Sequence, residues 1–159
     1  GELTGNFIFD WLGHDGEKLG DADMLTGVYH GINFTFRHAD AGDKLESDDP
    51  LDGHTGYYAG VARKDGKEIA FTIVADVNDG TQMVGAPFDW TLEEETKGTI
   101  EVQLYPTDPV ESKSMFDGLD FGALDEDGDG EVSIAPGDTA HNIFVRLVQS
   151  HVHYQAEAK

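Results

Sequence analysis

Apolar and polar residues alternate along most of the chain, and this period of two predicts β-strands rather than helices. The longest alternating run covers residues 25–38, where Ile32 and Phe34 share one face with His30 and His38. By the same pattern we expect strands over residues 3–12, 57–63, 68–77, 82–90 and 99–105, and a closing strand over residues 151–158. Short strands separated by turns rich in glycine and aspartate predict a mainly β fold.

The signals between the strands predict one tight hairpin and one or two short helices. Asp65-Gly66 lies between two alternating runs, which is the strongest short-range indication of a β-hairpin. Residues 110–124 are expected to be helical in part. A second helix is expected to start at Asp138 or Thr139 and to run to about Ser150. Its apolar residues also fit a strand, and of the two alternatives we favour the helix.

Together these elements predict a single domain over residues 1–159, built as an antiparallel β-sandwich with a late calcium-binding loop. A chain of 159 residues is long enough to bury a core. The segment 39–56 is acidic, rich in turn-forming residues and longer than most connections. We therefore expect it to be either functional or mobile.

The charge narrows the classes of partner. The chain carries 32 acidic and 10 basic residues, for a formal net charge of −22. Such a surface repels nucleic acid and anionic membranes, so we expect neither as a partner. No apolar run approaches the roughly 20 residues that span a bilayer, so no membrane insertion is expected. Two environments suit so acidic a chain: an extracytoplasmic space that contains calcium, or a cytoplasm of high salt.

The clearest chemical motif is an ordered run of aspartates near the C-terminus. Asp125, Asp127 and Asp129 alternate, and Gly130 follows at once, which lets the chain curl until the three carboxylates face one another. Ca²⁺ takes six to eight oxygen ligands, and such a loop adds the carbonyl of Glu131 and, directly or through water, Ser133. The motif predicts a calcium site.

This loop resembles the calcium loop of EF-hand and dockerin-type proteins over about a dozen residues. It departs from that pattern at the twelfth position, where those families carry a bidentate carboxylate and this chain has Pro136. Asp138, two residues later, is a candidate replacement, as is a carboxylate from elsewhere in the fold. The resemblance implies calcium binding, but not a regulatory pair of helices that opens.

Four histidines suggest a second metal site. On a strand, His151 and His153 would point to the same face, and His30 and His38 share a face of the strand over residues 25–38. If the two strands were neighbours, these imidazoles could bind a transition metal such as copper, zinc or iron. The ordinary alternative is that these histidines are exposed or packed in the core.

The layout as a whole is also similar to that of small, β-rich, metal-associated exported proteins of bacteria. The residues that carry this similarity are the early strands, the hairpin over residues 63–71 and the aspartate loop. Some members partner copper-handling or haem proteins in the periplasm, which implies a periplasmic or surface protein as a partner here. Consequently, we expect an extracytoplasmic location, whether periplasmic, cell-surface or secreted.

The chain contains no sequence motif of a known hydrolase or of a phosphate-binding loop, and we expect no enzymatic activity. The leading hypothesis is therefore a non-enzymatic metal-binding protein with a structural calcium loop. The alternative is a calcium-stabilised carbohydrate-binding or adhesion module that uses Trp11, Tyr57, Tyr58 and Trp90. A third hypothesis is a halophilic cytoplasmic protein whose acidity is an adaptation to salt.

Overall fold

Strands account for 36% of the residues and helices for 13% in a computed structural model of the chain, so the prediction of a mainly β fold is confirmed. The structure describes residues 1–8, 10–13, 16, 18–80, 83–95 and 97–159. The strands are β1 (Gly27–Thr35), β2 (Gly56–Lys64), β3 (Lys67–Ala75), β4 (Met83–Leu92), β5 (Ile100–Leu104), β6 (Glu131–Ile134) and β7 (Tyr154–Ala158). The α-helices are α1 (Phe121–Leu124) and α2 (Thr139–Val148), and two 3₁₀ turns are η1 (Ala41–Asp43) and η2 (His151–His153). The finer prediction, a sandwich, stays a prediction.

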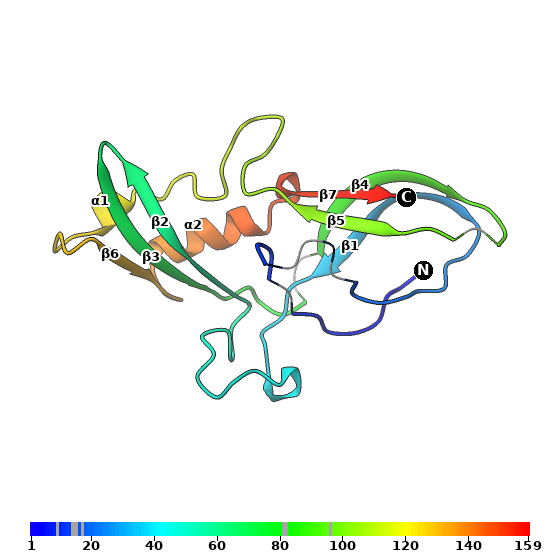
Figure 1. Cartoon of the computed structure of the whole chain (residues 1–159), viewed down its shortest axis with the longest axis horizontal. Helices are drawn as coiled ribbons and strands as arrows, with labels where there is room; N and C mark the ends of the chain where they lie inside the picture. Colours follow the sequence, from blue (N-terminus) through cyan, green and yellow to red (C-terminus); the bar gives the residue numbers. More distant parts are fainter. Residues whose placement is uncertain (9, 14–15, 17, 81–82, 96) are drawn as a thin grey trace.

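One end of the molecule is a three-stranded sheet in the order β2-β3-β6 (Figure 1). The predicted hairpin joins β2 to β3, and both turn residues have positive φ, 52° at Asp65 and 78° at Gly66. Two consecutive positive φ angles define the turn that matches the twist of paired strands. The third strand, β6, joins β3 in parallel, with Ala70 opposite Glu131 and Ile73 opposite Ile134. This parallel pair is a departure from the all-antiparallel prediction.

The other end holds two antiparallel pairs, β1 with β4 and β5 with β7 (Figure 1). Side chains from all four of these strands meet in one apolar cluster around Val84, Ala86 and Tyr154. The Tyr154 ring is 2% exposed and lies edge-on to Phe34, with ring centroids 5.0 Å apart. This cluster explains why the two pairs lie together.

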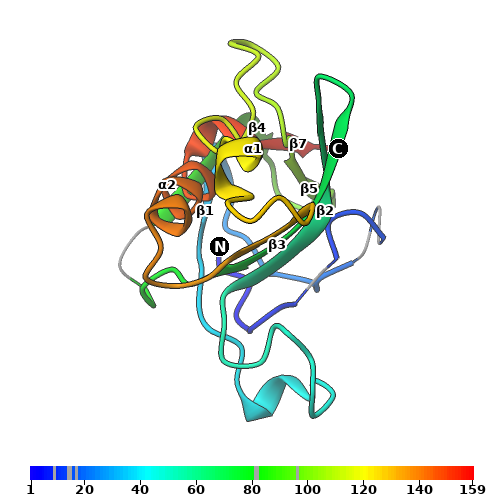
Figure 2. The same ribbon diagram turned by 90° about the vertical axis from the view of Figure 1, so that its left-hand side faces the viewer.

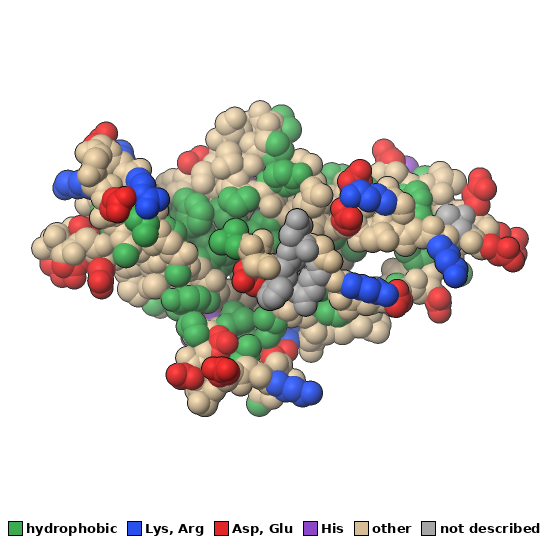
Figure 3. Space-filling view, in the orientation of Figure 1, with side chains coloured by type: hydrophobic (Ala, Val, Ile, Leu, Met, Phe, Trp, Pro, Cys, Tyr) green, Lys and Arg blue, Asp and Glu red, His purple; other side chains and the backbone are tan. Residues whose placement is uncertain are grey.

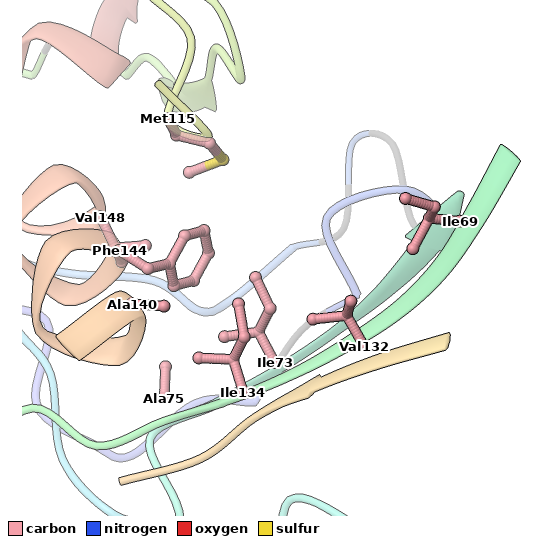
Figure 4. Packing of buried hydrophobic residues seen from close by; sticks show 9 residues of the cluster. All are labelled: Ile69, Ile73, Ala75, Met115, Val132, Ile134, Ala140, Phe144 and Val148. Carbon is pink, nitrogen blue, oxygen red and sulfur yellow. The ribbon is translucent and has the colours of Figure 1, made fainter. Parts of the chain in front are cut away.

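Helix α2 packs against the β2-β3-β6 sheet and forms the larger core (Figure 2). Figure 4 shows Phe144 and Ala140 of α2 pointing at Ile73 of β3 and Ile134 of β6. Phe144 is fully buried, and its ring centroid lies 4.8 Å from that of Tyr58. The predicted helix is thus confirmed, because its apolar residues recur at helical spacing and meet a sheet face.

Three predicted elements differ from the structure. None of the described residues of the segment 3–12 is in a strand, and Phe9 lies outside the described residues. Alternation alone does not make a strand, because its backbone also needs a ladder partner. Of residues 110–124 only the last turn is α-helical, and residues 151–153 form a 3₁₀ turn before the closing strand. Gln82, the first residue of another predicted strand, also lies outside the described residues.

Candidate metal centre

The aspartate loop joins α1 to β6, next to the sheet that α2 covers (Figure 2). Asp120 caps the start of α1, its side chain accepting a hydrogen bond from the Gly122 N–H, and Asp125 is the C-cap residue that follows Leu124. One carboxylate oxygen from each of Asp125, Asp127 and Asp129 lies within 4.8 Å of the other two. In the described part of the chain this is the only such group of three or more metal-binding side chains.

The backbone of the loop holds these carboxylates in place. Gly128 and Gly130 have φ angles of +72° and +84°, a region that residues with a Cβ atom rarely occupy. Asp129 accepts a hydrogen bond from the Glu131 N–H at 2.9 Å, and Asp125 accepts one from the Gly130 N–H at 3.3 Å. The curl that the glycine spacing predicts is therefore present, and it brings the three side chains together.

The remaining predicted ligands, the Glu131 carbonyl and Ser133, lie on β6, directly after this group. Glu131 opens β6 with an exposed side chain, and the preceding carbonyl, that of Gly130, accepts a hydrogen bond from the Ala70 N–H at 2.8 Å. The Ser133 hydroxyl lies 3.4 Å from that of Thr72, across the sheet. Asp127, Glu131 and Ser133 do line one shallow hollow, however, so all three face the same space.

Asp138, the candidate for the missing twelfth-position ligand, lines the same hollow as Asp127. Its carboxylate accepts a hydrogen bond from the Ala135 N–H at 2.8 Å and makes no capping bond to α2, although it occupies the N-cap position. Asp138 therefore closes the turn around Pro136. As arranged, it stands beside the three-carboxylate group rather than within it.

The chemistry of this group suits a hard cation. Carboxylate oxygens and backbone carbonyls are the ligands that calcium prefers, with water completing its shell. Asp127 and Asp129 are exposed and Asp125 is half-buried, so an ion would have access from solvent. Acidic side chains gather at this end of the molecule (Figure 3), and without a cation their charges repel one another.

The structure separates the four histidines that the sequence groups. Strand β7 pairs with β5, whereas β1 pairs with β4, so the two predicted metal-binding strands are not neighbours in a ladder. His151 and His153 lie in a 3₁₀ turn, whose three residues per turn point them in different directions. In the described residues the four do not form a group of ligand distance.

Three of these histidines lie in separate surroundings: His153 and His30 each have a hydrogen-bond partner, and His38 lies near a carboxylate without a hydrogen bond to it. His153 is 1% exposed, and its Nδ1 donates to the Tyr105 carbonyl at 2.9 Å, as a satisfied core histidine does. His30 lies at a β-bulge and its Nδ1 is 2.6 Å from an oxygen of the exposed Asp89. The Nε2 of His38 is 4.0 Å from an oxygen of Asp76.

Sequence reasoning missed two histidines that lie near His38. His54 and His141 both hydrogen-bond to Asp76, the first to its carboxylate and the second to its backbone N–H. The three residues come from different parts of the chain, and their spacing follows no motif. Only the long-range pairing of strands brings them together.

Two of the aromatic residues proposed as a sugar platform, Tyr58 and Trp11, pack against other rings of the cores. Tyr57 and Tyr58 are neighbours on β2 and therefore point to opposite faces of the sheet. Tyr58 packs on Phe144, and burial raises the pKa of its hydroxyl to about 12. Trp11 lies against Tyr154, with ring centroids 6.0 Å apart. Tyr58 and Trp11 therefore contribute to the two apolar clusters.

Comparisons of the chain with models of protein families, with curated proteins and with solved structures give no match. The resemblance of the aspartate loop to the EF-hand and dockerin loops therefore stays a prediction. None of the helices in the described residues is long and apolar enough to cross a membrane.

Proposed function

We propose that this protein is a non-enzymatic, calcium-binding β-domain that works outside the cytoplasm. Asp125, Asp127 and Asp129 would bind the ion, with the carbonyl of Glu131 and, directly or through water, Ser133 as further ligands. The observation that carries this proposal is the convergence of three alternating carboxylates to within 4.8 Å of one another. Converging carboxylates are typical of a site that a divalent cation neutralises.

The role of calcium in this proposal is structural. Strand β6 is four residues long and lies at the edge of its sheet, directly after the loop. Its Val132 and Ile134 belong to the larger core, so an ion that orders the loop also secures this strand against β3. Binding to the folded state alone stabilises it by about 2.7 kcal/mol when free calcium exceeds the Kd a hundredfold.

The acidity of the chain supports an extracytoplasmic location. A net charge of −22 destabilises a compact chain through self-repulsion, and calcium outside the cytoplasm relieves part of it. The sandwich is part of the same proposal. The β1-β4 and β5-β7 pairs, which share the cluster around Tyr154, would form its layers.

The experiment is thermal unfolding of single variants, each measured in calcium and in EDTA. Asp127→Ala and Asp129→Ala are expected to lower the Tm in calcium and to change it little in EDTA. Glu126→Ala is the matched control, because Glu126 is an exposed acidic residue of the same loop whose carboxylate lies outside the group. Equal losses in both media, or an equal loss in the control, would refute the assignment.

A further inference from the structure

Three segments far apart in the sequence come together where the two ends of the molecule join (Figure 1). They are the residues that follow β1, those that precede β2 and those that follow β3. The Ala39 N–H donates to the His54 carbonyl at 2.8 Å, and the Thr55 N–H donates to the Ala75 carbonyl at 3.0 Å. These backbone bonds fix His38, His54 and Asp76 beside one another.

Two imidazoles approach one carboxylate oxygen at this junction. The Nδ1 of His54 is 2.8 Å from Asp76 Oδ1, and the Nε2 of His38 is 4.0 Å from the same oxygen. The Nε2 of His38 is inaccessible to solvent and has no hydrogen-bond partner within the described residues. A buried polar atom without a partner destabilises the fold, so this nitrogen lacks an interaction that a ligand could supply.

Side chains from other segments anchor the backbone of Asp76 and of His38. The Nε2 of His141, a buried residue of α2, accepts a hydrogen bond from the Asp76 N–H at 3.1 Å. Its proton therefore sits on Nδ1, and this ring serves to anchor Asp76. The His38 N–H donates to a carboxylate oxygen of Asp79 at 2.9 Å. These bonds fix the backbone from which the His38 and Asp76 side chains extend.

We propose that His38, His54 and Asp76 bind a divalent transition-metal ion of the zinc class, at a site separate from the calcium loop. Two imidazoles and one carboxylate are a common set of three protein ligands for zinc, with water in the fourth position. This proposal does not depend on the proposed calcium function, and it shares only His38 with the four histidines that the sequence grouped.

The two distances to Asp76 approach those of a zinc site, but His38, His54 and Asp76 do not yet form a group whose ligand atoms all lie within 4.8 Å of one another, so an imidazole has to turn for all three to bind one ion. Zinc–ligand bonds of about 2.0–2.2 Å place two ligands of a tetrahedral site about 3.3–3.6 Å apart. The 4.0 Å between His38 and Asp76 is close to this separation. The 2.8 Å contact of His54 is a hydrogen bond, which the ion would replace with release of its proton. The His54 side chain is 35% exposed and has room to rotate.

Solvent reaches this junction. A polar hollow beside it is lined by Asp76 and His141, together with Asn78, Asn142 and Arg146. Of the three proposed ligands only Asp76 lines this hollow, so an ion would approach from the Asp76 side. The long segment 39–56, expected to be functional or mobile, returns the chain so that the His54 carbonyl accepts a hydrogen bond from the Ala39 N–H, next to His38.

The test is a titration of the untagged protein with zinc chloride by isothermal calorimetry, in saturating calcium so that the aspartate loop does not compete. We expect one zinc ion per chain. His38→Gln, His54→Gln and Asp76→Asn should each raise the Kd at least about tenfold, since even residues that only orient ligands cost 10–100-fold. The matched control is His30→Gln, because His30 likewise pairs with one aspartate, Asp89, and lies outside the cluster around Asp76.

A histidine-selective NMR spectrum of the wild-type protein tests the site without relying on variants that could unfold. Zinc is expected to shift the ring signals of His38 and His54 and to leave those of His30 and His151 in place. Absence of zinc binding, shifts confined to His30 and His151, or an equal loss in His30→Gln would each overturn the proposal.

Discussion

Two glycines of the aspartate region should respond to alanine in opposite directions. Gly122 lies within α1 without a positive φ, and a Cβ added there would meet only ordinary contact, 3.4 Å from Asp120 Oδ1. Gly130 has a φ of +84°, although its nearest non-local atom, the Glu68 carbonyl oxygen, is 3.8 Å away. The difference between the sites is therefore conformation and not space.

The expected changes in the free energy of unfolding follow from the backbone conformation at each glycine. Gly122→Ala should stabilise by about 0.5–1 kcal/mol, because alanine loses less conformational entropy than glycine in a helix. Gly130→Ala should destabilise by about 1 kcal/mol, the net of a left-handed penalty of about 1–2 kcal/mol and a smaller gain from the unfolded chain. For a chain of this size 1 kcal/mol corresponds to about 2–4 °C in Tm.

The assay is thermal unfolding by circular dichroism in EDTA, so that calcium affinity does not contribute. We expect the Tm of Gly122→Ala to rise and that of Gly130→Ala to fall, each by a few degrees. A rise in both variants would mean that the loop does not hold Gly130 in the left-handed conformation, and the curl that gathers the three carboxylates would then be refuted.

Three other predictions concern the core, pH and salt. Tyr154→Phe should lower the free energy of unfolding by about 1–2 kcal/mol in urea, because the buried Tyr154 hydroxyl donates a hydrogen bond to the Val148 carbonyl at 2.7 Å. An unchanged urea midpoint would contradict this hydrogen bond. The hydrogen bond from Arg37 holds the pKa of the Asp43 carboxyl below its ordinary value of 3.8. This pair therefore stabilises the fold fully above pH 3.8. The stabilisation is lost as the pH falls through the lower pKa of Asp43 in the folded state. Arg37→Gln should raise that pKa in a carboxyl NMR titration, and an unmoved value would refute the pairing. In EDTA, raising the sodium chloride concentration from about 0.01 to 1 M should raise the Tm. The salt shortens the Debye length from about 30 to 3 Å and so screens the repulsion among charges that sum to −22. A Tm that falls with salt would contradict the self-repulsion.

Local signals predicted the parts of the fold that depend on neighbours in sequence. The Asp65-Gly66 hairpin and helix α2 lie within a few residues of their predicted bounds, because turn residues and apolar periodicity report directly on the backbone. The curl of the aspartate loop belongs to the same class, since its glycines and side chains act within six residues.

Local sequence signals did not predict which distant strands pair with each other. Strand β6 was taken as part of the loop, and its parallel partner β3 lies about 60 residues earlier in the chain. The expected convergence of His151 and His153 with His30 failed for the same reason, because β7 pairs with β5. The cluster around Asp76 brings together residues from segments far apart in the chain, and no local sequence pattern predicts it.

The most direct test of the calcium proposal is the calcium content of the protein after equilibrium dialysis against micromolar calcium, measured by inductively coupled plasma mass spectrometry. The account predicts about one calcium ion per chain in the wild type and in Glu126→Gln, and a loss of that ion in Asp127→Asn and Asp129→Asn. A wild-type protein without calcium, or aspartate variants that retain it in full, would contradict the central claim.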